Sequence, residues 1–158
     1  MGIEIDLLKN YPKANRDLSQ RLDQKTDKDR AIARKFDKEF FDGERRHGYG
    51  GFSYQPRFWQ PVIPDFIKYW NLNNKSSVLD VGCAKGFMIN DFLEKIPGIK
   101  IRGVDISSYA IENCIDTTKG LVQVADAKEL PFDDNSFDVV ISINTCLLYT
   151  SPSPRDAT

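Results

Sequence analysis

The alternation of strand-like and helix-like runs after Ser77 is the feature that most constrains the fold. Four short runs, SVLDVG, IKIRGVDI, LVQVAD and FDVVISIN, are mainly apolar, as strands buried on both faces of a sheet are. The run FMINDFLEKI between the first two ends at a Pro-Gly pair, and SSYAIENCIDTTKG has a serine cap and stops at Gly120. The turn-forming DDNS precedes the fourth strand. This order predicts an α/β fold with a doubly wound parallel sheet covered on both faces.

The segment before the sheet predicts a helical cap and an aromatic loop. From Asp27 to Phe41 apolar residues recur every four positions among charges, which predicts one amphipathic helix. The glycine-rich and aromatic residues 49–59 predict a mobile loop, and a second helix is expected from about Pro61 or Pro64 to Trp70. The polar stretch that comes first predicts an irregular or loosely attached arm.

Composition narrows the class of partner. The chain has 158 residues, 41% hydrophobic and 28% charged, which suits one domain with one core. Its 22 Lys and Arg against 23 Asp and Glu give a net charge of −1, and no basic stripe carries stacking aromatics, so no nucleic-acid partner is expected. No apolar run approaches the ~18 residues of a membrane span, and the start MGIEID does not suit a signal peptide. We expect a cytoplasmic protein with no membrane span, and the sequence does not indicate an oligomeric state.

Cysteine and histidine usage argues against metal and disulfide sites. Cys83, Cys114 and Cys146 are odd in number and widely spaced, with no paired Cys-x-x-Cys. His47 is the one candidate imidazole base, but a single histidine beside two arginines is typical of a solvated surface residue. We therefore expect no metal, and no catalytic residue is assigned.

Polar residues stand at the ends of the predicted strands. Asp80, Asp105, Asp126 and Asn144 follow or end the four apolar runs, and ligands bind outside the carboxyl ends of strands in such sheets. The turn DVGCAKG after the first strand is rich in small residues, which lets its backbone approach a ligand. Asp105 lies 19 residues past Gly86, close to the spacing at which an acid grips both hydroxyls of a ribose. Together these features indicate an adenosine-containing ligand.

The glycine pattern disfavours a dinucleotide. A nicotinamide or flavin site requires G-x-G-x-x-G, whose last glycine permits tight packing of helix against strand. Counted from Gly82, the last position is Phe87 and the middle one is Ala84. The phosphate-binding pattern of nucleoside triphosphatases is also absent.

Three stretches, VLDVGCAKG, GVDIS and VADAKELPFDDNSFDVVISINT, together resemble motifs one to four of class I S-adenosylmethionine-dependent methyltransferases, type 11, in the subgroup similar to the ubiquinone and menaquinone methyltransferases. The resemblance covers about Ser77 to Thr145. It implies a Rossmann-like sheet, S-adenosylmethionine as cofactor and an activity of class EC 2.1.1.-. It does not indicate the substrate.

The resemblance implies roles for the turn after the first strand. Gly82, Cys83 and Gly86 would lie along the methionine and ribose part of the cofactor, and Asp80 would order that turn. Ala84 stands where many family members have glycine. A methyl group there is tolerable only if the residue keeps a negative φ, and the departure bears on the geometry of the loop and not on the cofactor.

The other strand ends receive roles from the same resemblance. Asp105 would bind the ribose hydroxyls, and Ile106 would pack on the adenine. Asp126 would take the adenine amino group, the Ala127 N–H would face the ring, and Asn144 would lie beside the sulfonium.

The chemistry implied is nucleophilic displacement at the sulfonium methyl, in which the protein contributes alignment and exclusion of water. The aromatic loop could close over the methyl group, so Tyr49 and Tyr54 are further candidates for cofactor contact and Arg57 for pairing with the cofactor carboxylate. The alternative is that these rings form the core of the cap.

Three functions are compatible with these residues. The first is methyl transfer to a small molecule or a glycan precursor. The second is another reaction of an adenosine cofactor on the same fold, such as aminopropyl transfer or nicotinamide-linked reduction, the latter disfavoured by Phe87. The third is an S-adenosylmethionine-binding module without turnover.

The end of the chain has a different character. The residues CLLYTSPSPRD, 146–156, resemble the translation of a transposon-type sequencing adapter, so we expect the authentic sequence to end near Thr145 and the sheet to be truncated after its fourth strand. The expected organisation is an arm over 1–27, the cap and aromatic loop over 28–75, a partial cofactor-binding unit over 76–145 and a non-native tail over 146–158.

Overall fold

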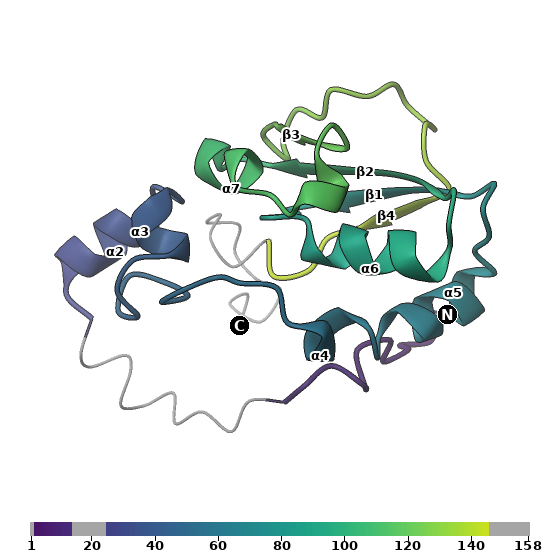
Figure 1. The fold of residues 1–158 in the computed structure, drawn as a ribbon, viewed down its shortest axis with the longest axis horizontal. Helices are drawn as coiled ribbons and strands as arrows, with labels where there is room; N and C mark the ends of the chain where they lie inside the picture. Colours follow the sequence, from purple (N-terminus) through teal and green to yellow (C-terminus); the bar gives the residue numbers. More distant parts are fainter. Residues whose placement is uncertain (1, 14–24, 146–158) are drawn as a thin grey trace.

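The computed structural model describes residues 2–13 and 25–145, and its centre is a sheet of four parallel strands (Figure 1). The strands are β1 (Ser77–Val81), β2 (Lys100–Asp105), β3 (Val122–Val124) and β4 (Val139–Ile141), in the spatial order β3-β2-β1-β4. The chain winds outward from β1 to β3 and then crosses to the other side of β1. The ends of β1 and β4 therefore form a switch point of the kind where ligands bind. The predicted Rossmann-like parallel sheet is confirmed.

One face of the sheet is covered by helices. The helices α5 (Ile63–Trp70) and α6 (Phe87–Lys95) pack on it, close to the bounds that the sequence predicts. Both helices and the strands contribute to one apolar core, whose fully buried members include Val62, Ile63, Val78, Ile89 and Phe92. Because residues of β1 and α6 both belong to this core, the turn between them has a fixed position relative to the sheet.

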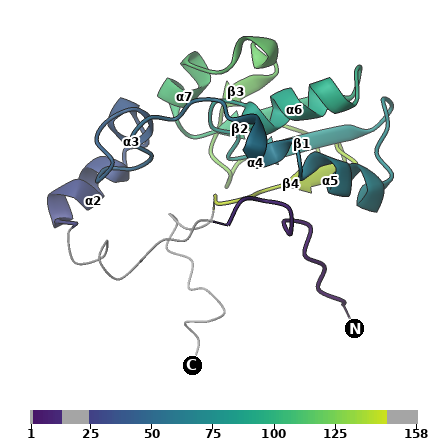
Figure 2. The same cartoon turned by 60° about the horizontal axis from the view of Figure 1, so that its bottom comes forward.

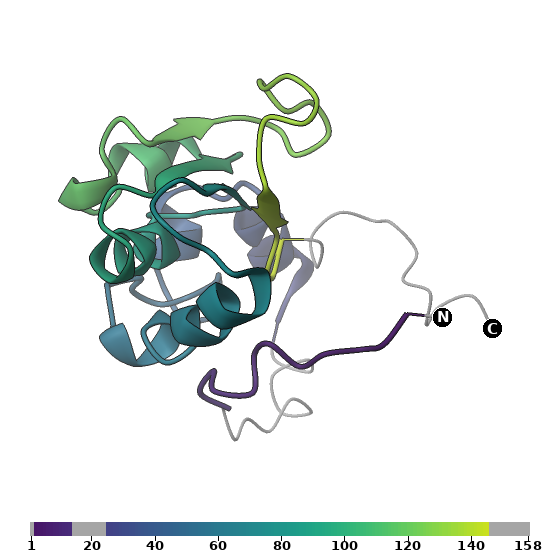
Figure 3. The same cartoon turned by 90° about the vertical axis from the view of Figure 1, so that its right-hand side faces the viewer.

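The opposite face is covered by a loop within the described residues. Leu79, Val81 and Val104 are buried there, packed against Ala125, Phe132 and Phe137 of the β3–β4 connection. Figure 3 shows that connection on the far side of the strands from α5 and α6. The predicted cover on both faces of the sheet is thus present, but on this face it is formed by a loop.

The predicted single helix from Asp27 to Phe41 is wrong, because the chain breaks in its middle. It forms α2 (Asp27–Ala33) and α3 (Lys38–Phe41), separated at Phe36, which adopts a left-handed φ of 51°. Asp37 then caps α3 by accepting a hydrogen bond from the Glu39 N–H at 3.1 Å. The Phe36 carbonyl accepts a hydrogen bond from the Ser107 hydroxyl, so a contact with the sheet domain stabilises the break. Both helices lie beyond the carboxyl ends of the strands (Figure 2).

The predicted helix from residue 107 to 120 is shorter than expected. It forms α7 (Ser108–Glu112) and the 3₁₀ turn η1 (Asp116–Thr118). Ser107 does cap α7, accepting the Ala110 N–H at 3.0 Å. The Ile115 N–H donates to the Lys85 carbonyl at 2.9 Å, a partner outside the helix, and this bond draws the chain out of the helical path.

The first described segment, residues 2–13, packs against α4 (Pro56–Trp59), a helix that the sequence did not predict, and against α5. The Tyr11 ring lies 5.6 Å from the Phe58 ring and 5.1 Å from the Trp59 ring, measured between centroids. The Asn10 amide donates to Asp65 at 2.7 Å. No helix among the described residues is long and apolar enough to cross a membrane.

Replacing Gly103 with alanine should lower the free energy of unfolding by about 1–3 kcal/mol, the usual range for overpacking a core. A Cβ on this residue of β2 would lie 2.5 Å from Ile89 Cδ1 and 2.8 Å from Cys83 Cβ. Urea unfolding measures the change. Lys100→Ala, an exposed position of the same strand, is the control and should change the value by less than about 0.5 kcal/mol. Equal stabilities of the two variants would contradict the prediction, because they would show that α6 can move away from the added methyl group without loss of stability.

Candidate functional site

A cavity of about 760 Å³ lies at the carboxyl ends of the strands, between the sheet and the cap. Pockets for small molecules and cofactors span ~300–1,000 Å³, so this one can hold a nucleoside-sized ligand. Its floor comes from the ends of all four strands, and its walls come from the cap and the aromatic loop.

The turn after β1 needs glycine at two positions. Gly82 has a φ of 84°, and a Cβ there would lie 2.2 Å from the Thr145 hydroxyl oxygen. Gly86, with a φ of 79°, is the N-cap of α6, and a Cβ there would lie 2.6 Å from the Thr118 hydroxyl oxygen. The N–H groups of Gly82 and Cys83 both donate to the Val104 carbonyl, at 2.8 and 3.0 Å. The turn is thereby fixed to β2 with its small residues facing the cavity.

Ala84 adopts a left-handed backbone conformation. Its φ is +49°, so the condition that alanine is tolerable here only at a negative φ is wrong. The left-handed region costs an alanine about 1 kcal/mol, and the hydrogen bond from the Ala84 N–H to Asp105 Oδ2, at 2.8 Å, offsets that cost. The turn keeps its shape without the glycine that the family pattern favours.

Two carboxyl groups lie at the floor of the cavity. Asp105 accepts hydrogen bonds from the N–H groups of Ala84 and Ser107 at 2.8 and 2.9 Å. Burial nevertheless raises its pKa above 3.8. Asp80 is buried, and desolvation, followed by the charge of Asp105, raises its pKa to about 8. A ligand with hydroxyl donors or positive charge would relieve both groups.

The predicted contact residues separate into two groups. Three do not line the cavity, namely Gly86, Asp126 and Tyr54, whereas the others do: Asp80, Gly82, Cys83, Asp105, Ile106, Ala127, Asn144, Tyr49 and Arg57. Asp126 is exposed, and its side chain accepts the Lys128 N–H at 2.9 Å. Burial raises the pKa of the Cys83 thiol, so this cysteine is a neutral wall residue.

Aromatic rings that the sequence reasoning did not assign to the site form the wall opposite the floor. The rings of Phe52 and Phe87 stack at 4.9 Å, and Tyr49 lies 4.3 Å from Phe52, all between centroids. Phe36, Phe40 and Phe41 also line the cavity. The fourfold spacing of Phe36 and Phe40 in the sequence indicated only the buried side of a helix, and the structure breaks that helix at Phe36.

Tyr54 anchors the aromatic loop away from the cavity. Its hydroxyl donates to Asp91 Oδ1 on α6 and accepts from the Gln60 amide at 3.3 Å. Burial and the adjoining Asp91 raise the pKa of Tyr54, and burial raises that of Asp91. These groups fix the loop against α6.

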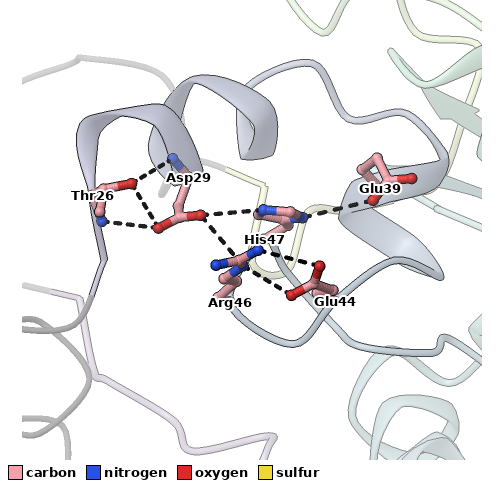
Figure 4. Close-up of polar contacts among 6 residues, drawn as sticks. All are labelled: Thr26, Asp29, Glu39, Glu44, Arg46 and His47. Carbon is pink, nitrogen blue, oxygen red and sulfur yellow. Dashed lines mark hydrogen bonds and ion pairs between the residues drawn. The ribbon is translucent and has the colours of Figure 1, made fainter.

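His47 is buried, so the prediction of a solvated surface histidine is wrong. Its Nε2 lies 3.2 Å from Asp29 Oδ1 and its Nδ1 lies 3.7 Å from Glu39 Oε2, so that it joins α2 to α3 (Figure 4). Asp29 also accepts both the N–H and the hydroxyl of Thr26 at the start of α2. The hydrogen bonds from Thr26 lower the pKa of Asp29. His47 does not line the cavity, and this cluster stabilises the cap.

Replacing Asp29 with asparagine should raise amide hydrogen exchange in α2 by about tenfold, because it removes the charge that faces His47 and the helix start. Exchange measured by mass spectrometry over residues 27–33 checks this. Asp27→Asn is the matched control, since Asp27 is exposed and, within residues 2–13 and 25–145, its ion pair is with Arg30 along the helix. Equal exchange in the two variants would contradict a stabilising role for the cluster.

A family model described as "Methyltransferase domain" matches residues 78–158, about half of the chain. The chain belongs to the methyltransferase domain family. The match begins in β1 and includes the glycine turn and the ends of all four strands, which are the elements that form the floor of the cavity.

Curated relatives of this methyltransferase domain match over about half of the chain or slightly less. The mitochondrial arginine-hydroxylase NDUFAF5 of Rattus norvegicus is 38% identical over 49% of this chain and 22% of its own length. Phosphoethanolamine N-methyltransferase 1 of Arabidopsis thaliana is 35% identical over 52% of this chain and 18% of its own. Malonyl-[acyl-carrier protein] O-methyltransferase of Geobacter sulfurreducens is 36% identical over 43% of this chain and 27% of its own. The chain therefore spans about a fifth to a quarter of these relatives.

A solved structure shares the fold of the methyltransferase domain. A protein of Methanococcus maripaludis, assigned to the S-adenosyl-L-methionine-dependent methyltransferases, is similar with a TM-score of 0.50 and 18% identity, over 58% of this chain and 44% of its own. At this identity the similarity supports the fold alone.

Among the described residues no three His, Cys, Asp or Glu side chains form a potential metal site.

Proposed function

We propose that this methyltransferase uses S-adenosylmethionine as donor and methylates a small molecule or a glycan precursor. The observation that carries the proposal is the position of Asp105, which faces a nucleoside-sized cavity directly beside the glycine turn after β1. In a chain of the methyltransferase domain family, this combination of a ribose-binding acid and a close backbone approach fits an adenosine cofactor.

The cavity floor fits the parts of that cofactor. Asp105 would accept hydrogen bonds from the ribose hydroxyls, and the Gly82 backbone, which Thr145 leaves no room to carry a side chain, lines the cavity beside it. Ile106, 43% exposed at the cavity, offers an apolar surface for the adenine, and Asn144 lies at the end of β4 for the sulfonium side. Asp126, whose Oδ1 accepts the Lys128 N–H, does not line the cavity, so a contact with the adenine amino group would need this loop to move.

The cofactor would supply a methyl group on a positively charged sulphur and a neutral thioether as leaving group. The protein would align the acceptor and exclude water, for which the stacked rings of Phe52 and Phe87 provide a low-dielectric wall. We assign no general base, because His47 lies in the cap cluster outside the cavity wall.

The side of the cavity that faces the sheet carries acidic residues, and the opposite side carries basic residues. The cap contributes Arg45 and Arg57 and the first described segment contributes Lys13, whereas the strand ends contribute Asp80 and Asp105. Cations bind carboxylates and phosphates well. The cap side therefore favours an acceptor with an acidic group, with Arg57 also available for the carboxylate of the cofactor.

The test has two stages. Calorimetry should show binding of S-adenosylmethionine and S-adenosylhomocysteine to the folded chain, with folding checked by circular dichroism. Transfer of a labelled methyl group is then assayed with paired acceptors, each acid beside its neutral amide, and the acids should react faster. A folded chain that binds neither cofactor would contradict the proposal.

A second candidate is another adenosine-cofactor reaction, or cofactor binding without turnover. It is favoured by one specific observation: a relative that is 38% identical over 49% of this chain is described as an arginine-hydroxylase, which names a different reaction. Binding of S-adenosylmethionine without methyl transfer to any acceptor of the panel would favour this candidate.

A further inference from the structure

Lys85 is a buried cation in the glycine turn that points away from the cofactor floor. Only 8% of the residue is exposed, and lysine is rarely so buried unless its charge is paired. Its Nζ lies 2.6 Å from Asp42 Oδ2 and 3.0 Å from the Phe52 carbonyl oxygen, and it lies 5.7 Å from the centroid of the Tyr109 ring. Lys85 thus bonds the turn after β1 to Asp42 and to Phe52, which lie 43 and 33 residues earlier in the sequence.

Asp42 is the centre of this cluster. Besides Lys85, it accepts the Phe52 N–H at 2.9 Å and the Tyr109 hydroxyl at 2.7 Å. Burial raises the pKa of Asp42, but the hydrogen bonds from Lys85, Phe52 and Tyr109 outweigh it and hold the pKa below 3.8. An ionised Asp42 at the end of α3 therefore connects the cap, the aromatic loop, α7 and the turn after β1.

The cluster also fixes the aromatic wall. Phe52 is bonded through its N–H to Asp42 and through its carbonyl to Lys85, and its ring stacks on Phe87. On the other side of Lys85, the adjoining Ala84 N–H donates to Asp105. Two adjacent residues of the turn thus make the two contacts, Ala84 with Asp105 of the cavity floor and Lys85 with Phe52 of the aromatic wall.

We propose that Lys85 and Asp42 are positioning residues, which hold the aromatic wall of the cap at a fixed place relative to the cofactor turn. The proposal rests on the proposed function above and goes beyond it, because it assigns the alignment of the acceptor side to an ion pair whose two residues do not line the cavity. The cofactor binds at the strand ends. Loss of the ion pair should therefore uncouple the cap and leave cofactor affinity nearly unchanged.

Hydrogen exchange of the aromatic loop reports on the coupling. The N–H groups of Tyr49 and Gly51 donate to the carbonyls of Phe40 and Phe41, at 2.9 and 3.0 Å, and the Phe52 N–H donates to Asp42. In Lys85→Met these amides should exchange at least about tenfold faster. Saturating S-adenosylhomocysteine should slow their exchange in the wild type but not in Lys85→Met, while its Kd changes by less than about threefold.

The variants form a cycle with matched controls. Asp42→Asn should also speed this exchange, and the effect of the double variant should be smaller than the sum of the two single effects, because both variants remove the Lys85–Asp42 ion pair. Lys85→Arg, which retains the ion pair, should restore slow exchange and the response to ligand. Lys119→Met is the control for charge, since Lys119 pairs with Asp116 at the same 2.6 Å but at the surface, and it should leave the loop unchanged.

The outcomes separate the two proposals. Wild-type exchange rates in Lys85→Met would overturn the positioning role, as would additive effects of Lys85→Met and Asp42→Asn. A loss of S-adenosylhomocysteine binding that parallels the faster exchange would also overturn it, because the cap and the floor would then be a single unit. If the folded wild type does not bind the ligand, the proposed function fails, and the exchange of the ligand-free variants still decides whether Lys85 holds the loop.

Discussion

Replacing Asp105 with asparagine should weaken the binding of S-adenosylmethionine and S-adenosylhomocysteine by about 100-fold. A hydrogen bond to a charged acceptor contributes about 1.5–3 kcal/mol, and two ribose hydroxyls would share this carboxylate. A loss of about 3 kcal/mol corresponds to about 100-fold in Kd. Calorimetric titration of the folded variant measures the effect.

The asparagine variant also alters the turn, so the experiment needs a check of structure. Asp105 accepts the N–H groups of Ala84 and Ser107, and an amide can accept at its oxygen only. Circular dichroism and the unfolding midpoint therefore accompany the titration. Asp116→Asn is the control, because Asp116 is an exposed acid outside the cavity wall. Equal affinities of the two variants would remove Asp105 from the proposed site.

The strand ends were predictable from the sequence because two local rules determine them. Apolar runs separated by helices give parallel strands, and the carboxyl ends of parallel strands meet at one edge. Asp80 and Asp105 therefore had to lie near each other, as they do at the floor of the cavity. The direction of a loop side chain follows no such rule, and Asp126 in fact bonds to the backbone of its own loop.

The cap was not predictable in the same way, because contacts between distant residues determine it. Phe36 breaks the expected helix where its carbonyl bonds to Ser107, 71 residues later. Lys85 reaches Asp42 across 43 residues. Periodicity within a window of ten to eighteen residues cannot show such partners. The sequence shows which residues of the cap are apolar. Only the tertiary contacts determine that several of them line a cavity.

The free energy of unfolding of the ligand-free chain should fall as pH rises from about 4 to about 8, chiefly because of Asp80. Its unfolded pKa is 3.8 and burial raises the folded value to about 8. The folded state thus binds the proton more tightly, so this stability is fully present below pH 4 and is lost as pH rises through 8. The slope of one such group approaches about 1.4 kcal/mol per pH unit. Urea unfolding at pH 5, 6, 7 and 8, at constant ionic strength, measures it.

Asparagine at position 80 should flatten that slope, because it keeps the shape of the side chain and cannot ionise. Part of the slope should remain, since burial also raises the pKa values of Asp91 and Asp105. Asp138→Asn is the matched control: hydrogen bonds from Ser77 lower the pKa of Asp138, so its contribution is present above pH 4 and is lost on acidification. The control should therefore keep the wild-type slope between pH 5 and 8. A wild type whose stability is constant over that range would mean that Asp80 is already ionised in the empty cavity, and its charge would then need a partner.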